Sequence, residues 1–377
     1  DVHHITYYTW IHAMSTQSET NTALVLNTRG SPLQLTTQPI PEAVYGSAVL
    51  RVLATLVYAN ARSVFAGQFP TPLTTPVTPS AACIARVHAT GPDATSLKEG
   101  DLVFCDLFTR SRDDPSVCHL QGYMGGHESF EKAWTHGAYA RYARVPLESC
   151  WTLPETILQR YSCADLCYLG NVCIALAGLL DVHVQAGDTV IIAPATGQFG
   201  GSAVQAALAL GARIIACGRN GEVLGQMKRV FGGRFETVQM VGDVAVDTEA
   251  IKALCGKGAD AFVDFTPPRA AESKHMMSCI AALRENGTAL IMGLVFGEAS
   301  IPYADVMRKG LRVQGRCMFD RWHVEQAIKL LEIGALKVGS GEGSGIAVKT
   351  FKMNEVDQAL DAAADEGVWG QMVVLEP

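Results

Sequence analysis

The stretch GDTVIIAPATGQFGGSAVQAALALGARIIACGRN, residues 187–220, decides the fold. It begins with the apolar run TVIIA, continues through a turn that contains glycine, and then has a series of small residues that ends at Gly211. A second apolar run, RIIAC, follows directly. This order predicts a strand, a turn, a helix and a second strand, which together form a βαβ unit with parallel strands.

The turn in this stretch resembles a dinucleotide-binding fingerprint, in which a G-x-G-x-x-G pattern lies between a strand and a helix. Ala195, Gly197 and Gly200 occupy the three pattern positions. Gly197 would let the backbone approach a pyrophosphate, and Gly200 would let the helix pack closely on the strand. The helix N-terminus would supply N–H groups to the phosphates, and an alanine at the first position is compatible if its φ is not positive. We therefore predict that a dinucleotide contacts the turn residues Thr196, Gly197, Gln198, Phe199 and Gly200.

The end of the second strand distinguishes NAD from NADP. An acidic residue there would bind the ribose 2′-hydroxyl of NAD, but this chain has Gly218, Arg219 and Asn220. Gly218 leaves room, the Arg219 guanidinium suits a 2′-phosphate, and Asn220 could add a hydrogen bond. These residues predict NADP(H) as the cofactor. The alternative is that Arg219 is an ordinary solvated loop residue.

The segments on either side of this unit differ from each other. Residues from about 22 to 150 contain short strand-like runs with no long helical pattern between them, which predicts an antiparallel, barrel-like domain. From residue 156 onward, helical patterns alternate with short apolar runs such as ADAFVDF and TALIMGLV, which predicts a doubly wound parallel sheet. We expect an α/β protein with a N-terminal extension at 1–21, a β-rich catalytic domain at 22–155 and 311–377, and an inserted Rossmann domain at 156–310.

Composition excludes several classes of function. The chain has 377 residues, 48% of them hydrophobic and 18% charged, so a large core is expected. The net charge of −7 argues against nucleic acid or an anionic membrane as a partner. The 11 cysteines have no regular spacing, which indicates reduced thiols in a cytoplasmic protein. No run of 18 apolar residues predicts a membrane span, and residues 1–13 lack the pattern of a signal peptide.

The order of domains and the stretches PATGQFGGSAVQAALALGARIIACGRN, VHATGPDATSLKEGDLVF and GQMVVLE resemble the medium-chain dehydrogenase/reductase superfamily. The resemblance extends from about residue 20 to the C-terminus. It implies a GroES-like catalytic domain, hydride chemistry at a nicotinamide, and a possible homodimer formed through the nucleotide domain. It also implies that backbone in the segment MGLVFG, at Gly293, Leu294 and Val295, contacts the nicotinamide amide, and that residues 264–268 flank the ribose.

Zinc-dependent members of this superfamily have a Cys after an early strand and a Gly-His-Glu motif further on. In this chain Asn60 lies near the first position, and Ser80, Ala81 and Ala82 stand where the motif is expected. These side chains cannot replace thiolate and imidazole on zinc. The Gly-His-Glu at 126–128 is in the wrong place, and only Cys118 lies between Cys105 and Cys150, so a structural zinc lobe is not expected either. We predict no metal site.

Candidate catalytic residues follow from the resemblance. Tyr58 and Asn60 lie in the loop that carries the first metal ligand in zinc-dependent relatives, and Tyr58 could donate a proton. Asn171 falls where the superfamily often has a Thr near the nicotinamide. A structural role at a strand end is an equal alternative for Tyr58. Tyr168, His127 and His136 are weaker candidates.

These observations lead to one main hypothesis and one alternative. The main hypothesis is a zinc-independent, NADPH-dependent reductase that acts on an activated C=C or C=O bond, or a C=N bond, of a small or medium apolar metabolite. The alternative is a non-redox isomerase, cyclase or binding protein with the same fold, which the scarcity of obvious proton donors suggests. A zinc-dependent alcohol dehydrogenase is a third and more distant possibility.

Overall fold

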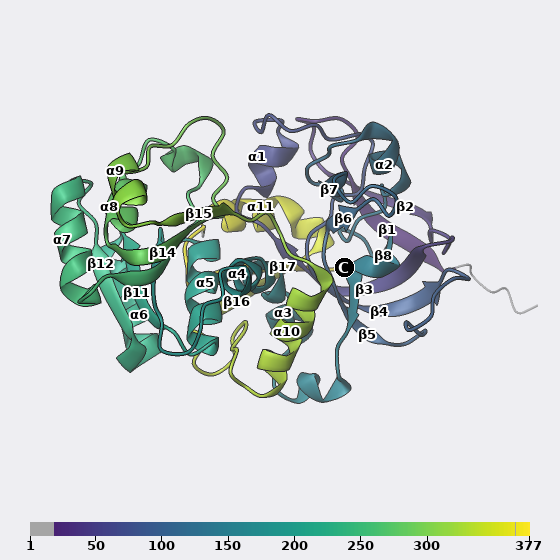
Figure 1. Ribbon diagram of the computed structural model, residues 1–377. Helices are drawn as coiled ribbons and strands as arrows, with labels where there is room; N and C mark the ends of the chain where they lie inside the picture. The colour runs from purple at the N-terminus through teal and green to yellow at the C-terminus, as the bar shows by residue number, and fades with distance from the viewer. Residues whose placement is uncertain (1–18, 366) are drawn as a thin grey trace, which may run out of the picture.

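The computed structural model describes residues 19–365 and 367–377 and consists of two lobes side by side (Figure 1). Most of the expected extension, including the segment 1–13, lies outside the described residues. Its predicted end at residue 21 is wrong, because β1 (Thr20–Val25) already belongs to the catalytic lobe. Asn21 is buried there, and its side chain exchanges two 2.9 Å hydrogen bonds with the backbone of Tyr142.

A parallel sheet forms the core of the nucleotide lobe, as the sequence predicts. Its strand order is β12-β11-β10-β13-β14-β15, the doubly wound order in which the direction of strand addition reverses between β10 and β13. The strands are β10 (Thr189–Ala193), β11 (Arg213–Gly218), β12 (Phe235–Gln239), β13 (Ala259–Asp264), β14 (Leu283–Ile291) and β15 (Arg312–Gly315).

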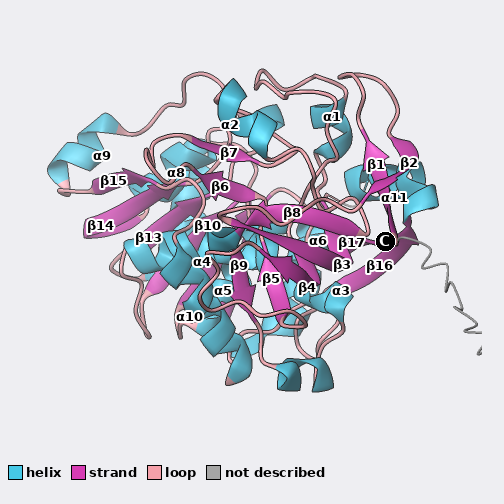
Figure 2. Cartoon of the chain, turned by 90° about the vertical axis from the view of Figure 1, so that its right-hand side faces the viewer, coloured by secondary structure: helices cyan, strands magenta, loops and turns pink. Residues whose placement is uncertain are grey.

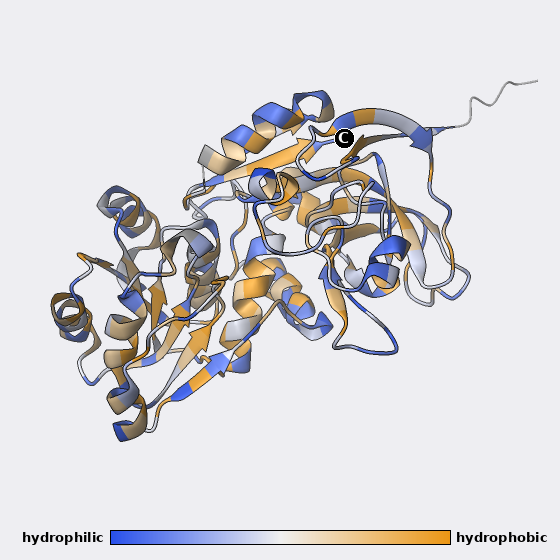
Figure 3. Ribbon diagram, turned by 90° about the horizontal axis from the view of Figure 1, so that it is seen from above, coloured by the Kyte–Doolittle hydropathy of each residue, from blue (hydrophilic) through white to orange (hydrophobic). Residues whose placement is uncertain are grey.

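Helices cover both faces of this sheet, and the strand residues alternate between the two faces. Val190 and Ile192 of β10 pack in the cluster that contains helix residues Val204 and Ala207, whereas Ile191 packs in the cluster on the opposite face. The surrounding helices are α4 (Leu169–Asp181), α5 (Gln198–Ala209), α6 (Gly221–Phe231), α7 (Val244–Cys255), α8 (His275–Ala281), α9 (Tyr303–Arg308) and α10 (Arg321–Glu332). Figure 3 shows apolar strands enclosed by helices with polar outer surfaces.

The predicted boundary at residue 311 is wrong. β15 pairs in parallel with β14 and completes the nucleotide sheet, and α10 packs against α4 of the same lobe. The chain returns to the catalytic lobe later, through β16 (Ala347–Lys352) and β17 (Gln371–Glu376). The run LRVQGRCMF has strand character, but strand character does not reveal which sheet a strand joins.

The catalytic lobe is a mainly antiparallel sheet, as predicted, with the order β16-β17-β3-β4-β5-β9 and with β8 paired to β3 (Figure 2). Its strands are β3 (Ser47–Val57), β4 (Cys83–Thr90), β5 (Leu102–Cys105), β8 (Tyr142–Pro146) and β9 (Cys150–Thr152). Two small hairpins flank it, β1 with β2 (Gln34–Pro39) and β6 (Phe108–Arg110) with β7 (Cys118–Leu120).

Short helices complete the two lobes. The α-helices are α1 (Ala61–Phe65), α2 (Glu128–Ala133), α3 (Cys163–Leu166) and α11 (Val356–Asp365). The 3₁₀ turns are Leu147–Ser149, Glu155–Gln159, Gly232–Arg234, Pro268–Ala270 and Met353–Glu355. The helical stretch Cys163–Asp181 is long and apolar enough to cross a membrane, but it is largely buried in this fold, as expected of a core helix.

Candidate cofactor and active site

The nucleotide turn connects β10 to α5 at the point where the strand order reverses. Gly197 is the N-cap residue of α5, and no side chain caps this helix. A Cβ on Gly197 would meet no atom within 4 Å, whereas a Cβ on Gly200 would overlap the carbonyl oxygen of Pro194. The two glycines therefore have the separate functions that the sequence suggests: Gly197 leaves open space, and Gly200 permits close packing.

Alanine is tolerated at the first pattern position. Ala195 is buried, its N–H donates to the carbonyl oxygen of Cys217 at 2.8 Å, and it is not among the described residues with positive φ. The free N–H groups of the first turn of α5 remain available for an anion, together with the positive end of the helix dipole. The turn thus fits a dinucleotide pyrophosphate.

A C-terminal segment of the chain lies against this turn, which sequence reasoning missed. The N–H of Trp369 donates to the carbonyl oxygen of Thr196 at 2.9 Å, and Val368 forms a β-bridge with Gly197. The indole of Trp369 occupies the position that a Cβ on Gly201 would take. Only the glycine-rich composition of the turn hinted at such a close approach, and it did not indicate which segment approaches.

The end of β11 carries the residues that were predicted to lie beside the ribose of the cofactor. A Cβ on Gly218 would lie 2.8 Å from the Thr196 methyl group, so glycine is required by close packing within the turn. Arg219 is exposed, and its side chain makes no hydrogen bond or ion pair with a described residue. Asn220 caps α6, because its Oδ1 accepts the N–H of Val223 at 3.1 Å. The Asn220 side chain therefore has a structural role, whereas Arg219 is a cation at this edge that has no partner among the described residues.

Across the switch point, the ends of β13 and β14 carry a buried polar cluster. Asp264 accepts from the N–H of Gly293 at 3.3 Å, and the N–H of Leu294 donates to the carbonyl oxygen of Thr266 at 2.9 Å. His275 Nε2 lies 2.9 Å from the Thr266 hydroxyl and 3.1 Å from the Asp264 carboxylate. This cluster holds the predicted nicotinamide-contacting segment, in which Leu294 is exposed and Gly293 and Val295 are half-buried.

His275 was not predicted, whereas Asp264 and Thr266 lie in the segment 264–268 that was expected to flank the ribose. The Asp in ADAFVDFTPP indicated the end of a strand, but His275 comes eleven residues later and only the folded loop brings it back to the carboxylate. The three side chains are nearly inaccessible to solvent, so they support the backbone of this edge from beneath.

Tyr58 stands between the catalytic lobe and the nucleotide turn. Its ring packs on Phe199 with centroids 6.3 Å apart, and edge-on against Tyr123 at 5.5 Å. A Cβ on Gly170 would lie 3.4 Å from the Tyr58 hydroxyl, so this hydroxyl faces α4. The residue is only 6% exposed, its hydroxyl has no described hydrogen-bond partner, and burial raises the pKa of the phenol well above 10.

The two other predicted catalytic residues differ in whether their side-chain oxygens already have a hydrogen-bond partner. Asn60 Oδ1 already accepts the Tyr123 hydroxyl at 2.5 Å, so the amide positions that tyrosine. Asn171 lies on α4 and is buried, with an Oδ1 that has no described partner. Its backbone oxygen accepts the Ser202 hydroxyl of α5 at 3.2 Å. The structure therefore brings Tyr58 and the first turn of α4 together with the nucleotide turn.

The weaker candidates contribute less. Tyr168 is buried with an unpartnered hydroxyl, and burial raises its pKa. His127 is exposed at the start of α2. His136 is half-buried, and both burial and the nearby Arg144 lower its pKa. No contact in the described part of the chain connects either histidine to Tyr58.

Asp106 is a further buried group that sequence reasoning missed. It follows β5, is 2% exposed, and its Oδ1 accepts the N–H of Phe108 at 2.8 Å. Its Oδ2 has no described partner, and burial raises the pKa of the carboxyl to about 7. The only signal in the sequence was an acidic residue directly after the apolar run LVFC.

The positions that would ligate a catalytic zinc have no suitable donors. Ala81 and Ala82 are buried methyl groups, and the Ser80 hydroxyl accepts the N–H of Ala138 at 3.1 Å. Across the residues that the structure describes, no group of three or more His, Cys, Asp or Glu side chains could hold a metal ion. A zinc ion does not fit the residues present at this site.

Comparison with known proteins agrees with this architecture. The family model described as "Alcohol dehydrogenase GroES-like domain" matches residues 46–155, and the model described as "Zinc-binding dehydrogenase" matches residues 199–332. The second match extends past residue 311, in agreement with the position of β15 in the nucleotide lobe.

Individual relatives span nearly the whole chain. An alcohol dehydrogenase of Rhizobium meliloti is 25% identical over 95% of this chain and 99% of its own length. A quinone oxidoreductase of Sus scrofa is 24% identical over 78% of this chain and 88% of its own. A structure from Sinorhizobium meliloti 1021 with NADP bound, described as that of a zinc-binding dehydrogenase, has a TM-score of 0.74 at 19% identity and covers 95% of this chain and 100% of its own. From the two matched domains, their order and the doubly wound sheet, the chain belongs to the medium-chain dehydrogenase/reductase superfamily.

Proposed function

We propose that this protein is a zinc-independent, NADPH-dependent reductase of activated C=C or C=O bonds in small or medium apolar metabolites. The observation that carries the proposal is the combination of a nucleotide turn, an exposed arginine at the end of β11 without a described partner, and amide, hydroxyl and methyl groups at the expected zinc-ligand positions. Such a site can deliver hydride, but it has no Lewis acid of its own with which to oxidise an unactivated alcohol.

In this proposal, different segments of the chain bind the pyrophosphate, the 2′-phosphate and the carboxamide of the cofactor. The N-terminus of α5 and the open face of Gly197 suit the pyrophosphate, and the Arg219 guanidinium suits a 2′-phosphate. The backbone at Gly293, Leu294 and Val295 suits the carboxamide, with Asp264 holding the Gly293 N–H from beneath. When bound, the reduced nicotinamide supplies the hydride.

The surroundings of Tyr58 favour a flat, apolar substrate. Phe199 stacks with Tyr58 on one side and with Phe265 on the other, both with centroids 6.3 Å apart. An aromatic lining of this kind attracts conjugated apolar groups, and enones and quinones are such groups. In this proposal the Tyr58 hydroxyl, which faces α4 in the structure, gives a proton to the substrate.

The test is turnover with a panel of enones and quinones, followed as loss of NADPH absorbance in the purified protein. The expected result is oxidation of NADPH by at least one conjugated acceptor, slower oxidation of NADH, and no loss of rate after treatment with a chelator. Equal affinity for NADH and NADPH would overturn the cofactor preference, and one tightly bound zinc per chain would overturn the mechanism. Tight NADPH binding without any turnover would favour a non-redox role.

A further inference from the structure

A small cavity lies in the catalytic lobe between α2, the end of β7 and the segment 73–77. It measures about 10 Å³, which is about the space that one water molecule needs. Thr74, His119, Gly125 and Glu131 are among the residues that line it. Because the cavity is so small, a molecule inside it touches several of these residues at once.

His119 of β7 is a polar residue of this wall without a described partner. It is 4% exposed, and neither ring nitrogen makes a hydrogen bond with the described residues. Its ring packs edge-on against Phe130 of α2, with centroids 4.8 Å apart. Burial lowers the pKa of this imidazole to about 4, so the ring is neutral near pH 7. A neutral imidazole has one N–H donor and one acceptor nitrogen, and a buried polar group without a partner is unfavourable.

Glu131 of α2 contributes a carboxylate to the same wall. It is 7% exposed, its Oε2 accepts the N–H and the hydroxyl of Thr74, and its Oε1 accepts the N–H of Gly126. A Cβ on Gly125 would overlap Oε1, so the glycine makes room for the carboxylate. A carboxylate can accept about four hydrogen bonds, two on each oxygen. One acceptor position on Oε1 therefore remains.

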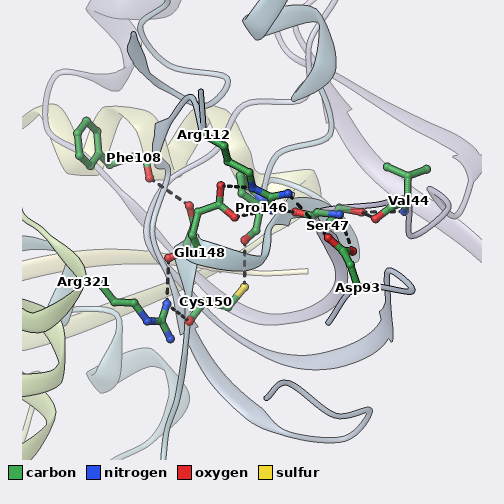
Figure 4. Close-up of polar contacts among 11 residues, drawn as sticks. Val44, Ser47, Asp93, Phe108, Arg112, Pro146, Glu148, Cys150 and Arg321 are labelled. Atoms are coloured by element: carbon green, nitrogen blue, oxygen red, sulfur yellow. Dashed lines mark hydrogen bonds and ion pairs between the residues drawn. The ribbon is translucent and has the colours of Figure 1, made fainter. Parts of the chain in front are cut away.

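The charge of Glu131 is compensated differently from that of a surface carboxylate. Glu148 pairs with the Arg112 guanidinium at 2.6 Å (Figure 4). Within the described ranges, Glu131 has no ion pair with a lysine or arginine, and its partners are neutral donors. A buried carboxylate needs hydrogen-bond donors, so a further neutral donor in the cavity would complete the set.

Water suits these two side chains better than a metal ion does. Whichever tautomer His119 adopts, its nitrogen at the cavity is a donor or an acceptor, and water can complement either one. A metal ion can use only the acceptor nitrogen, and it requires further ligands. No group of three or more His, Cys, Asp or Glu side chains in the described part of the chain could hold a metal ion.

We propose that this cavity binds one water molecule, which accepts the ring N–H of His119 and donates to Oε1 of Glu131. The two ring nitrogens point away from each other, so this water reaches one of them. The water links β7 to α2, and β7 leads directly to Tyr123, whose hydroxyl donates to Asn60. The binding site is independent of the proposed reaction.

The test is a high-resolution crystal structure of the full-length protein and of three variants: His119→Phe, His119→Gln and His127→Phe. In the wild type, one density peak should lie within about 3.2 Å of a ring nitrogen of His119 and of Oε1 of Glu131. His119→Phe removes both nitrogens and should lose the peak, whereas His119→Gln keeps a donor and an acceptor and should retain it. His127 is exposed at the start of α2, so His127→Phe is the matched control and should retain the peak.

Hydrogen exchange in solution provides a second measurement. Amides of residues 119–126 should exchange about tenfold faster in His119→Phe than in the wild type and in His127→Phe. Absence of the wild-type peak would overturn the proposal, as would its persistence in His119→Phe. An anomalous signal at the peak after a manganese soak would identify a cation and overturn the assignment to water. Unchanged exchange in His119→Phe would overturn the link between β7 and α2. If His119→Phe does not fold, the wild-type peak and His119→Gln still decide the question.

Discussion

The phenol ring of Tyr58 lies nearly parallel to the ring of Phe199, with an angle of 19° between their planes. Tyr58 follows β3 of the catalytic lobe, and Phe199 is in the first turn of α5 in the nucleotide lobe. This pair joins the two lobes beside the nucleotide turn. The position of a chemical group on either ring therefore depends on contacts with both lobes.

Replacement of Tyr58 by Phe should keep this stack and remove only the hydroxyl. Because the buried hydroxyl has no described partner, we expect the free energy of unfolding to rise by about 1 kcal/mol, or to stay unchanged, while turnover falls. Chemical denaturation and steady-state kinetics on the same preparation would measure both. A marked loss of stability would show that the hydroxyl has a structural partner.

The two glycines of the nucleotide turn provide a matched pair of variants. Gly197→Ala adds a methyl group to open space with a φ of −91°, so folding should be unaffected while NADPH affinity falls about tenfold, or 1.4 kcal/mol. Gly200→Ala places its methyl group on the Pro194 carbonyl and should instead lower the melting temperature. Calorimetric titration and thermal unfolding distinguish the two effects. Equal effects of both variants on stability would contradict the assignment.

Arg219 should control the choice between NADPH and NADH. A charge-assisted hydrogen bond contributes about 1.5–3 kcal/mol, so Arg219→Gln should weaken NADPH binding roughly ten- to a hundredfold and leave NADH binding unchanged. Because Arg219 is exposed, the melting temperature should stay the same. Arg229→Gln, at an exposed arginine of α6, is the control and should bind both cofactors as the wild type does. Parallel losses for NADH and NADPH would indicate a general role for the Arg219 charge.

The open edge of the nucleotide sheet leads to a prediction about assembly. β15 ends the strand order, so its outer edge is unpaired among the described residues, and Val313 is 44% exposed there. We propose that a second copy of the chain pairs with this edge, since the unpaired N–H and C=O groups of an edge strand readily accept another strand. Val313→Lys should convert a dimer to a monomer in light-scattering chromatography, whereas Ile333→Lys at the end of α10 should not. A monomeric wild type would contradict the prediction.

The sequence was most informative where local pattern and chemistry coincide. The turn from Ala193 to Gly200 combines an apolar strand, spaced glycines and a small-residue helix, and each signal is local, so the Rossmann unit could be predicted. The alternating burial of β10 and β11 follows from the same runs.

Long-range pairing could not be predicted in the same way. The partner of β15 is a strand more than twenty residues away. The contact of Trp369 with Thr196 connects the C-terminal part of the chain to the nucleotide turn, which lies far from it in the sequence. Asp106 was missed for a related reason: its raised pKa comes from burial, and the sequence around it shows only an acidic residue at the end of a strand.

The final prediction concerns stability against pH at Asp106. The pKa of this carboxyl is about 7 in the folded protein and 3.8 in the unfolded chain, so unfolding releases a proton between these values. The free energy of unfolding therefore falls as pH rises through this window, by up to about 4 kcal/mol in total. Asp106→Asn removes the ionisable group and keeps an oxygen that can accept the Phe108 N–H.

The variant should accordingly match the wild type at pH 4 and become more stable as pH rises to 8, measured as the difference in urea unfolding free energy. His119 is buried with a pKa lowered to about 4, so it weakens the fold as pH falls below 6.5, but it is present in both proteins and cancels in the difference. A pH-independent difference would show that Asp106 keeps its ordinary pKa in the folded protein.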